Sequence, residues 1–493
     1  MAEEILNKIY YYLLVWDKLV IPPFWLILQA IGIAAGIHAL MHKRDPRSAL
    51  GWTAVCWMIP GLGTVLYLLF GVNRIQTRAQ SWRSNWDYSR ITPVGVGQVD
   101  AESHDPPFDR ATFLALSRVS KSVTAVPLLM GNQVKPLFNG EQAYPAMLAA
   151  IRAAKHWIFL GTYIFETNKT GLEFLHALRD AVDRGVKVRV LVDGVGIRYS
   201  RPRIQKLLKK FRIPFALFLP LGLGPRGIHM NLRTHRKILV VDGEIGFTGG
   251  MNLGDRHLVE LVGNPCPTQD IHFQISGPIV EQLKEAFLLD WNFAEKPQRE
   301  EKFSCDGKPK GEALSRGIIA GPNEDFEKLK WIVEGAIHAA KEHLRIMTPY
   351  FIPDRAMSSA LITAALRGVN VEIILPEANN LAYVKWASQA LIDELLEHGI
   401  KFYYQPAPFA HSKLFLVDDF YSLIGSANLD PRSLRLNFEF NVEFYDKGLS
   451  KVLTEHFASV VARSRSITAD YLEGRNFFVR LRDNTAKLFS PYL

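Results

Sequence analysis

Two stretches of the chain carry the same spacing of polar residues, and this repeat limits what the chain can fold into. HRKILVVDGEIGFTGGMN begins at His235, and HSKLFLVDDFYSLIGSAN begins at His411. Each has a lysine two residues after the histidine and an aspartate five residues after the lysine, followed by a glycine and an asparagine at identical offsets. A long-period repeat indicates that one structural unit occurs twice. We therefore expect two similar halves in this chain of 493 residues.

Matching runs also precede the two stretches. The β-rich runs at 156–165 and 343–352 correspond, as do RGVKVRVLVDG and RGVNVEIILPE. Strands that alternate with apolar helical patterns predict an α/β sheet in each half. Tyr163 and Tyr350 fall at matching positions on strands and are expected in the core. We expect the halves to pack face to face about a pseudo-twofold axis, with the repeated histidines and lysines converging on one cleft.

The N-terminal region has the composition of a membrane anchor. No charged residue occurs at 19–41 or at 49–72, and a spanning helix needs ~20 apolar residues. A cleaved signal peptide is disfavoured because a second apolar run follows at once. We predict two transmembrane helices within residues 1–75, although Pro60 and Gly61 would also suit a kinked or re-entrant helix.

Basic residues flanking the two apolar stretches predict their orientation. The connector between them has three basic residues, whereas the outer flanks have six: Lys8, Lys18, Arg74, Arg78, Arg83 and Arg90. With two spans, both flanks lie on one side of the membrane. The excess of Lys and Arg places that side, with the rest of the chain, in the cytoplasm.

The sequence divides into four regions. They are an anchor at 1–75, a polar linker with a lead-in segment at 76–130, a first half at 131–300 and a second half at 312–493.

Charge and cysteine content limit the kinds of partner and of metal or disulfide site that the chain can have. The formal net charge of +9 favours an anionic partner, which leaves nucleic acid, an acidic metabolite and an anionic membrane surface open. The three cysteines are far apart, so neither a disulfide framework nor a CxxC metal site is indicated.

The repeated residue types suit chemistry on a phosphate. Residues two apart on a strand share a face, so the histidine and lysine of each copy point the same way. Imidazole acts as nucleophile or proton carrier, while lysine and asparagine suit phosphate oxygens. Pseudo-twofold symmetry would place the two histidines on opposite sides of one phosphorus. A solvated edge strand explains a single copy but not two. A metal site is disfavoured because the lysines would repel a cation, and no cofactor is expected.

Both copies resemble the signature of the phospholipase D superfamily, HxKxxxxD followed by GSxN or GGxN. Within that superfamily the chain is most similar to bacterial cardiolipin synthases over essentially its whole length, including TYIF, TPYFIP and NLRTHRKI. The resemblance implies an α/β fold of two tandem phospholipase D-like α/β/α sandwich halves. It also implies a two-helix anchor in the bacterial inner membrane, as a multi-pass protein.

The resemblance further implies a reaction. A phosphatidyl group would pass from one phosphatidylglycerol to another through a phosphohistidine, giving cardiolipin and glycerol without a metal. By similarity to the family, His235 is the nucleophile and His411 the general acid and base, which the nearly symmetric sequence alone does not distinguish. Asn252 and Asn428 would hold the phosphate. The motif supplies the catalytic set His235, Lys237, Asp242, His411, Lys413 and Asp418.

A catalytic imidazole also needs a carboxylate to orient it. Asp242 and Asp418 belong to the motif, but at ~3.3 Å per strand residue they lie too far along, which favours a structural role in anchoring the turn. Asp270 in QDIHFQISG and Glu439 in NFEFNVEFYD are better candidates. Their matching locations and the family similarity suggest that Asp270 orients the second histidine and Glu439 the first, across the interface. The alternative is a surface ion pair at each.

The sequence leaves rival functions open. A phospholipase D hydrolase would use the same residues with water as acceptor, and a nuclease of the superfamily would suit the positive charge. The anchor and the lack of an aromatic and basic stripe argue against a nuclease, so no nucleic acid is expected. A noncatalytic scaffold is disfavoured because both motifs are intact. The expected partners are phosphatidylglycerol and anionic membrane lipids, with the oligomeric state and acyl-chain preference left open.

Overall fold

The computed structural model describes residues 21–43, 46–71, 97–220, 232–295, 301–322 and 326–490. Contacts divide the chain into two compact units, Met1–Ser81 and Trp82–Leu493. The predicted linker lies mostly outside the described residues up to position 96.

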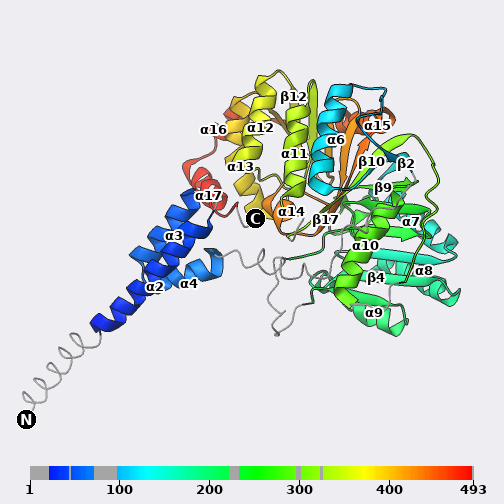
Figure 1. Cartoon of the computed structure of the whole chain (residues 1–493), viewed down its shortest axis with the longest axis horizontal. Coiled ribbons are helices and arrows are strands. Elements are labelled where there is room, and N and C mark those ends of the chain that lie inside the picture. Colours follow the sequence, from blue (N-terminus) through cyan, green and yellow to red (C-terminus); the bar gives the residue numbers. More distant parts are fainter. Residues whose placement is uncertain are drawn as a thin grey trace, which may run out of the picture. The chain divides into compact units, whose positions relative to one another are not determined.

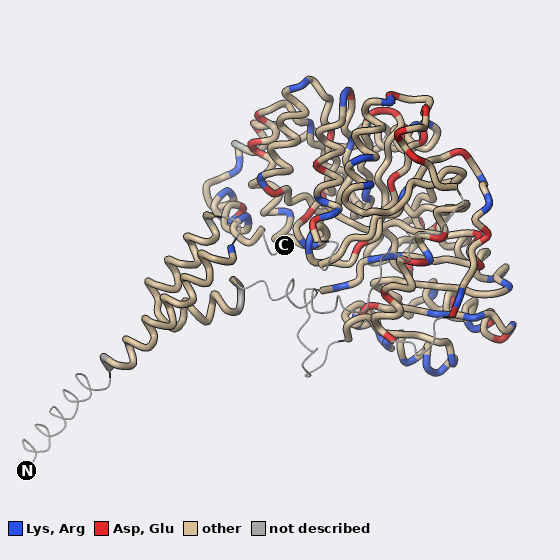
Figure 2. The backbone as a smooth tube through the Cα atoms, in the orientation of Figure 1, with Lys and Arg blue, Asp and Glu red and all other residues tan. Residues whose placement is uncertain are grey.

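One helix of the N-terminal unit is long and apolar enough to span a membrane, among the residues described. α2 (Ile21–His42) contains the candidate span Pro23–His42, and Figure 2 shows no charged residue along it. Its 20 residues rise ~30 Å, which matches the hydrocarbon core. The first predicted span is therefore a continuous helix.

The second apolar stretch is broken. α3 (Pro46–Met58) is followed by the short helix α4 (Leu62–Leu66) and the π-helix η1 (Tyr67–Gly71). Pro60 and Gly61 separate α3 from α4, and Gly61 has a φ of 81°. The 13 residues of α3 rise only ~20 Å, short of the hydrocarbon thickness. Instead of a second continuous helix, this stretch has the kink that its Pro-Gly pair allowed.

Small residues let the helices of this unit approach closely. A Cβ added at Gly32 would lie 2.5 Å from the carbonyl oxygen of Cys56, so only glycine fits where α2 meets α3. Tyr67 Oη lies 2.7 Å from His38 Nδ1 and ties η1 back to α2. The stretch after the break therefore packs against the spanning helix.

Within its described residues, the second unit is organised by a sixteen-stranded sheet (Figure 1). The first half contributes β2 (Leu128–Phe138), β3 (Trp157–Thr162), β4 (Lys187–Asp193), β5 (Phe215–Phe218), β6 (Ile238–Val241), β7 (Ile245–Gly249) and β9 (Ile271–Ser276). The second half contributes β10 (Ala313–Ala320), β11 (His343–Met347), β12 (Asn370–Pro376), β13 (Lys401–Gln405), β15 (Leu414–Val417), β16 (Tyr421–Gly425), β17 (Glu439–Tyr445) and β18 (Arg465–Ile467). The remaining strand, β1 (Gln98–Val99), pairs with β2.

The strand order confirms the repeat. The first half runs β9-β7-β6-β3-β4-β5 and the second β17-β16-β15-β11-β12-β13. In both halves the last three strands are parallel and the others antiparallel. The predicted matches between strands of the two halves therefore hold.

Helices cover both faces of the sheet (Figure 1). On β3, Ile158 and Leu160 join the apolar cluster of α7 (Asn139–Ala153) and α8 (Lys169–Asp183). The residue between them, Phe159, stacks on Phe287 of α10 (Val280–Glu295) with ring centroids 4.8 Å apart. Alternate residues of a strand point to opposite faces, so β3 is buried on both sides, as in an α/β/α sandwich.

The described part of the second unit contains further helices. They are α9 (Ile204–Lys210), α11 (Lys328–Ala339), α12 (Arg355–Leu366), α13 (Ala382–Glu397), α14 (Pro431–Arg435), α15 (Lys447–Val461), α16 (Ala469–Glu473) and α17 (Phe477–Lys487), with the 3-10 turns η4 (Gly196–Arg198) and η5 (Asp255–His257).

The halves join edge to edge, which corrects the expectation of two separate sheets packed face to face. β2 pairs antiparallel with β10, with a register irregularity between Ala313 and Ser315. A second link is the parallel pair β8 (Thr268–Gln269) and β14 (Phe409–Ala410), and Thr234 forms a bridge with Phe438. These links lie directly before the two motif histidines in the chain, so the interface itself positions both motifs.

A helix within the predicted lead-in segment packs on the second half. α6 (Arg110–Thr124) places Phe113 and Leu116 in the same apolar cluster as Ile332 of α11. The buried Arg316 of β10 donates to the Ser117 carbonyl oxygen at 3.0 Å. Residues that precede the first half in sequence therefore complete the core of the second half.

Candidate active site

The two motif histidines line one pocket. His235 and Lys237 directly precede β6, and His411 and Lys413 directly precede β15, so each motif enters its strand at the same place. Both histidines are among the pocket's lining residues, and both lysines are buried. The predicted convergence of the repeated histidines on one cleft is confirmed. These residues lie in the segments that lead into the strands rather than in the strands themselves.

His411 contacts a carboxylate from the other half. Its Nδ1 lies 2.7 Å from Oδ2 of Asp270, which sits between β8 and β9 and is 1% exposed. The other carboxylate oxygen of Asp270 accepts a hydrogen bond from the backbone N–H of Ile271 at 2.8 Å. Lys413 Nζ lies 2.9 Å from His411 Nδ1 and 3.2 Å from Nε2. Carboxylate, imidazole and ammonium thus form one buried cluster.

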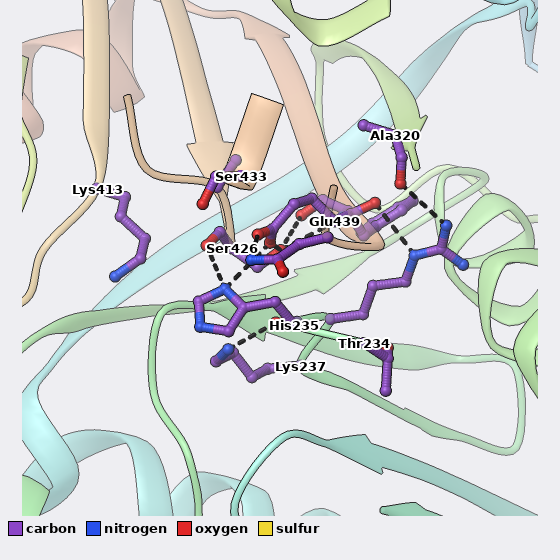
Figure 3. Close-up of polar contacts among 12 residues, drawn as sticks. Thr234, His235, Lys237, Ala320, Lys413, Ser426, Ser433 and Glu439 are labelled. Atoms are coloured by element: carbon purple, nitrogen blue, oxygen red, sulfur yellow. Dashed lines mark hydrogen bonds and ion pairs between the residues drawn. The ribbon is translucent and has the colours of Figure 1, made fainter. Parts of the chain in front are cut away.

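His235 contacts a carboxylate from the second half in turn. Its Nδ1 lies 3.2 Å from Oε2 of Glu439, the fully buried first residue of β17. Ser426 Oγ donates to the same carboxylate oxygen at 2.5 Å, and the Ser426 carbonyl oxygen lies 3.1 Å from Nδ1 (Figure 3). With the Nδ1 proton facing these acceptors, Nε2 keeps its lone pair for the pocket. Lys237 Nζ donates to the His235 carbonyl oxygen at 2.6 Å, as Lys413 Nζ does to the His411 carbonyl oxygen at 2.5 Å.

Both predicted carboxylate contacts are therefore present, and both cross the interface. Burial of Asp270 and Glu439 excludes the alternative of surface ion pairs. Their effect on catalysis stays a prediction.

The two copies of the motif differ at the residue after the glycine, which is Gly250 in the first copy and Ser426 in the second. A Cβ at Gly250 would lie 2.4 Å from the Asp270 carboxylate, whereas Ser426 at the equivalent place donates to Glu439.

Burial changes the pKa values of the ionisable side chains around this pocket. It lowers the pKa of Lys237 to about 7 and that of Lys413 to about 8, because desolvation disfavours the ammonium form. Burial likewise lowers the pKa of both histidines. For Glu439, burial raises the pKa, but the His235 and lysine charges outweigh it and the net pKa is lowered. An anionic phosphate in the pocket would favour the charged form of both lysines.

The two motif asparagines line the same pocket. Asn252 Oδ1 accepts a hydrogen bond from the Ile164 backbone N–H at 3.1 Å, which turns its amide NH₂ toward other acceptors. Asn428 Oδ1 is buried and has no hydrogen-bond partner within the described part of the chain. Both amides are placed where a ligand would meet them.

Asp242 and Asp418, which the motif adds to the catalytic set, are not among the residues that line the pocket. The Asp242 carboxylate accepts three backbone N–H bonds, from Lys155, His156 and Trp157, at 2.7–2.8 Å. Asp418 binds residues 341–343 in the same way. Both sit at the far end of their strand with a φ of 52° and anchor the start of the neighbouring strand. This is the structural role that their distance along the strand predicted.

Two tyrosines expected in the core line the pocket instead. The Tyr163 ring lies 5.6 Å from the His235 ring, and the Tyr350 ring lies 6.5 Å from the His411 ring. Their positions also do not match. The Thr162 hydroxyl binds the Ile164 carbonyl oxygen, while the equivalent Thr348 hydroxyl binds that of Tyr350. Tyr350 is therefore equivalent to Ile164, one residue beyond Tyr163.

Sequence reasoning missed another pair of pocket residues, Arg256 and Arg432. Each lies four residues after a motif asparagine. Extending the comparison of the two copies past the asparagines would have found them.

A family model for "Cardiolipin synthase, PLD-like domain" matches residues 147–291 and 333–461, so each match contains one copy of the motif. The chain belongs to the phospholipase D-like cardiolipin synthase family. A second model, for the phospholipase D-nuclease N-terminal region, matches residues 30–71, which include most of α2 and the broken stretch after it.

Named members of the family match this chain along nearly all of its length. The major cardiolipin synthase of Bacillus subtilis (strain 168) is 32% identical over 473 residues, which cover 94% of this chain and 97% of that protein. Cardiolipin synthase A of Pseudomonas putida is 32% identical over 471 residues, covering 95% and 97%. The similarity therefore includes the N-terminal unit as well as both halves.

A solved structure shares much of the fold of this chain. The phosphatidylserine synthase of Haemophilus influenzae Rd KW20 superposes with a TM-score of 0.59 at 17% identity. The match covers 77% of this chain and all of that one. At this identity the likeness is one of fold alone.

Proposed function

We propose that this family member is a membrane-anchored cardiolipin synthase. It transfers a phosphatidyl group from one phosphatidylglycerol to a second, releasing glycerol. The observation that carries the proposal is the pair of histidines in one pocket, each in contact with a buried carboxylate from the opposite half. The cardiolipin synthase names of relatives that match over 94% of the chain support the choice of substrate.

In the first step, His235 attacks the phosphorus of the donor lipid. A P–N bond forms from Nε2, and the P–O bond to the headgroup glycerol breaks. His411 gives its proton to the departing glycerol oxygen. The contact of His235 Nδ1 with Glu439 stabilises the positive charge that the ring gains in this step.

In the second step, the glycerol hydroxyl of the acceptor lipid attacks the phosphohistidine. His411 now accepts the proton, the P–N bond breaks, and cardiolipin leaves with both histidines restored. Lys237, Lys413 and the amides of Asn252 and Asn428 hold the nonbridging oxygens as charge develops on them. The close Asp270–His411–Lys413 cluster suits a residue that must release and then recover one proton.

The anchor keeps both lipids within reach. α2 supplies one candidate span, and we propose that residues 46–71 form a second, kinked passage that returns the chain to the same side. The protein would then be a multi-pass protein of the bacterial inner membrane. The excess of basic residues flanking the spans favours a cytoplasmic pocket.

Product analysis tests this function. Purified full-length protein is incubated with phosphatidylglycerol vesicles in excess chelator, and lipids and glycerol are quantified. We expect cardiolipin and glycerol in equal amounts, loss of both in His235→Ala, and normal amounts in His338→Ala, which removes an exposed histidine of α11. Phosphatidic acid as the only lipid product would make the protein a hydrolase. Cleavage of DNA without any lipid product would make it a nuclease.

A further inference from the structure

The repeat continues beyond the motif asparagines to a pair of arginines that differ in their surroundings. Arg256 and Arg432 both line the pocket from equivalent positions of the two halves. Arg256 donates to Glu166 Oε1 from Nε at 3.0 Å and from a second guanidinium nitrogen. The charge of Arg256 is thus already balanced by the protein.

The second half lacks a carboxylate at the place of Glu166. The backbone N–H of Glu166 binds the Leu253 carbonyl oxygen, and the backbone N–H of Ile352 binds that of Leu429 in the same way. Ile352 is therefore the equivalent residue, and its side chain is buried in an apolar cluster with Val384. The repeat has an Arg–Glu pair in one half and an arginine opposite an isoleucine in the other.

Arg432 has no ion-pair or hydrogen-bond partner for its guanidinium among the described residues. Asp430, two residues earlier, directs its carboxylate to the backbone N–H of Ser433 at 2.8 Å, where it caps α14. Arg432 therefore offers five N–H donors to the pocket, and its charge acts on the Asp430 carboxylate without a direct ion pair. A partly buried arginine in this state is suited to a ligand that is itself anionic.

The proposed reaction requires a second phosphate site. The donor phosphate is held between the two histidines, but the acceptor phosphatidylglycerol carries its own phosphate, which does not react. That phosphate lies one glycerol unit from the attacking hydroxyl, so it must enter the same pocket. Water or free glycerol, as acceptors, bring no phosphate.

We infer that the Arg432 guanidinium binds the nonreacting phosphate of the acceptor lipid and so favours transfer to an anionic phospholipid over transfer to a neutral alcohol or water. This inference rests on the proposed function. It assigns the preference for the acceptor to a residue outside the HxKxxxxD and GxxN motifs.

The test compares two acceptors in one preparation. Full-length protein in phosphatidylglycerol vesicles is given labelled glycerol, and cardiolipin formation is measured together with incorporation of the label into phosphatidylglycerol. Because a hydrogen-bonded charge contributes ~1.5–3 kcal/mol, Arg432→Gln should lower the ratio of cardiolipin formation to glycerol exchange by about 10-fold or more. Arg432→Lys keeps the charge without the fork of donors and should lower the ratio by a smaller factor.

The matched control is Arg355→Gln, which removes an exposed arginine of α12 that is not among the residues lining the pocket. Its ratio should equal that of the unaltered protein. An unchanged ratio in both Arg432 variants, with normal thermal melting, would overturn the inference while leaving the proposed function intact. Glycerol exchange without any cardiolipin in the unaltered protein would instead remove the proposed function, and the need for a second phosphate site with it.

Discussion

His235 and His411 occupy equivalent places in the repeat but have different neighbours. Each lysine donates to the carbonyl oxygen of its own histidine, but Lys413 Nζ also lies within 3.2 Å of both ring nitrogens of His411. His235 Nε2 is therefore the nitrogen better placed to attack a phosphorus. The sequence is nearly symmetric at these positions, so only the side-chain geometry supports unequal roles.

The two buried carboxylates should act on different steps. Glu439→Gln removes the charge that stabilises His235 during attack, and we expect formation of the phosphatidyl adduct to slow by ~10- to 100-fold. Asp270→Asn should slow release of the adduct by a similar factor. Rapid-mixing measurements with phosphatidylglycerol separate the two steps. If each variant lowered only the melting temperature, the carboxylates would be structural.

The lowered pKa values of the lysines predict how substrate affinity depends on pH. In the free protein Lys237 and Lys413 lose their charge as pH rises through about 7 and about 8. A bound phosphate favours the charged form, so affinity is strongest below these values and weakens as pH rises through them. The KM for phosphatidylglycerol should therefore increase between about pH 7 and 9. Lys237→Arg, which stays charged, should reduce this increase, and a KM that is flat over this range would contradict it.

At the scale of single residues, the sequence predicted the types of side chain in the site better than their exact places in the repeat. Asp270 and Glu439 could be found because the repeat places a carboxylate at the start of the same strand in both halves. The one-residue offset between Tyr163 and Tyr350 could not be found in the same way. Both tyrosines follow their strand by a few residues, so an alignment of the two sequences pairs them with each other. Arg432 was missed because the comparison of the two copies ended at the asparagines, and its difference from Arg256 depends on Glu166, which lies far away in sequence.

At the scale of elements, the motif aspartates hold the β6–β7 and β15–β16 turns to the strands beside them. Asp242→Ala leaves three backbone N–H groups without their acceptor, which should cost about 2–3 kcal/mol of unfolding free energy. We expect a lower melting temperature but substantial specific activity at low temperature, measured by calorimetry and product analysis. Asp418→Ala should behave alike. Lost activity at unchanged stability would return these residues to the catalytic set.

Elements that depend on local pattern were predicted, and those that depend on distant partners were not. The strands of both halves follow from apolar runs between turn signals, and α2 follows from its uncharged length. α6 was not predicted because its apolar face packs against α11 of the second half, over two hundred residues away. The sequence does not decide the break after α3, because Pro60 and Gly61 are compatible with either a kink or a continuous span.

At the scale of the whole molecule, the pocket belongs to neither half alone. Each histidine finds its carboxylate across the interface, and the joined sheet fixes this arrangement. The sequence predicted the two halves and their convergence. It did not predict the edge-to-edge junction, because pairing of β2 with β10 leaves no periodic signal.

The N-terminal unit should matter for access to lipid rather than for the pocket itself. The contact division at Ser81 leaves the second unit with its own core, so removal of residues 1–75 should keep it folded. We expect turnover on phosphatidylglycerol vesicles to fall sharply, with a smaller loss on detergent-dispersed lipid, because the tether no longer holds the pocket at the bilayer. Equal losses on both forms of lipid would show that the unit supports the fold or the chemistry directly.

Mapping the covalent intermediate tests the central claim most directly, namely that two histidines from opposite halves divide the work on one phosphate. His411→Asn retains the proposed nucleophile but lacks the group that activates the acceptor. Incubated with phosphatidylglycerol, quenched and analysed by peptide mass spectrometry, this variant should carry a phosphatidyl group on His235. An adduct on any other residue, or cardiolipin formed at the normal rate without His411, would contradict the account.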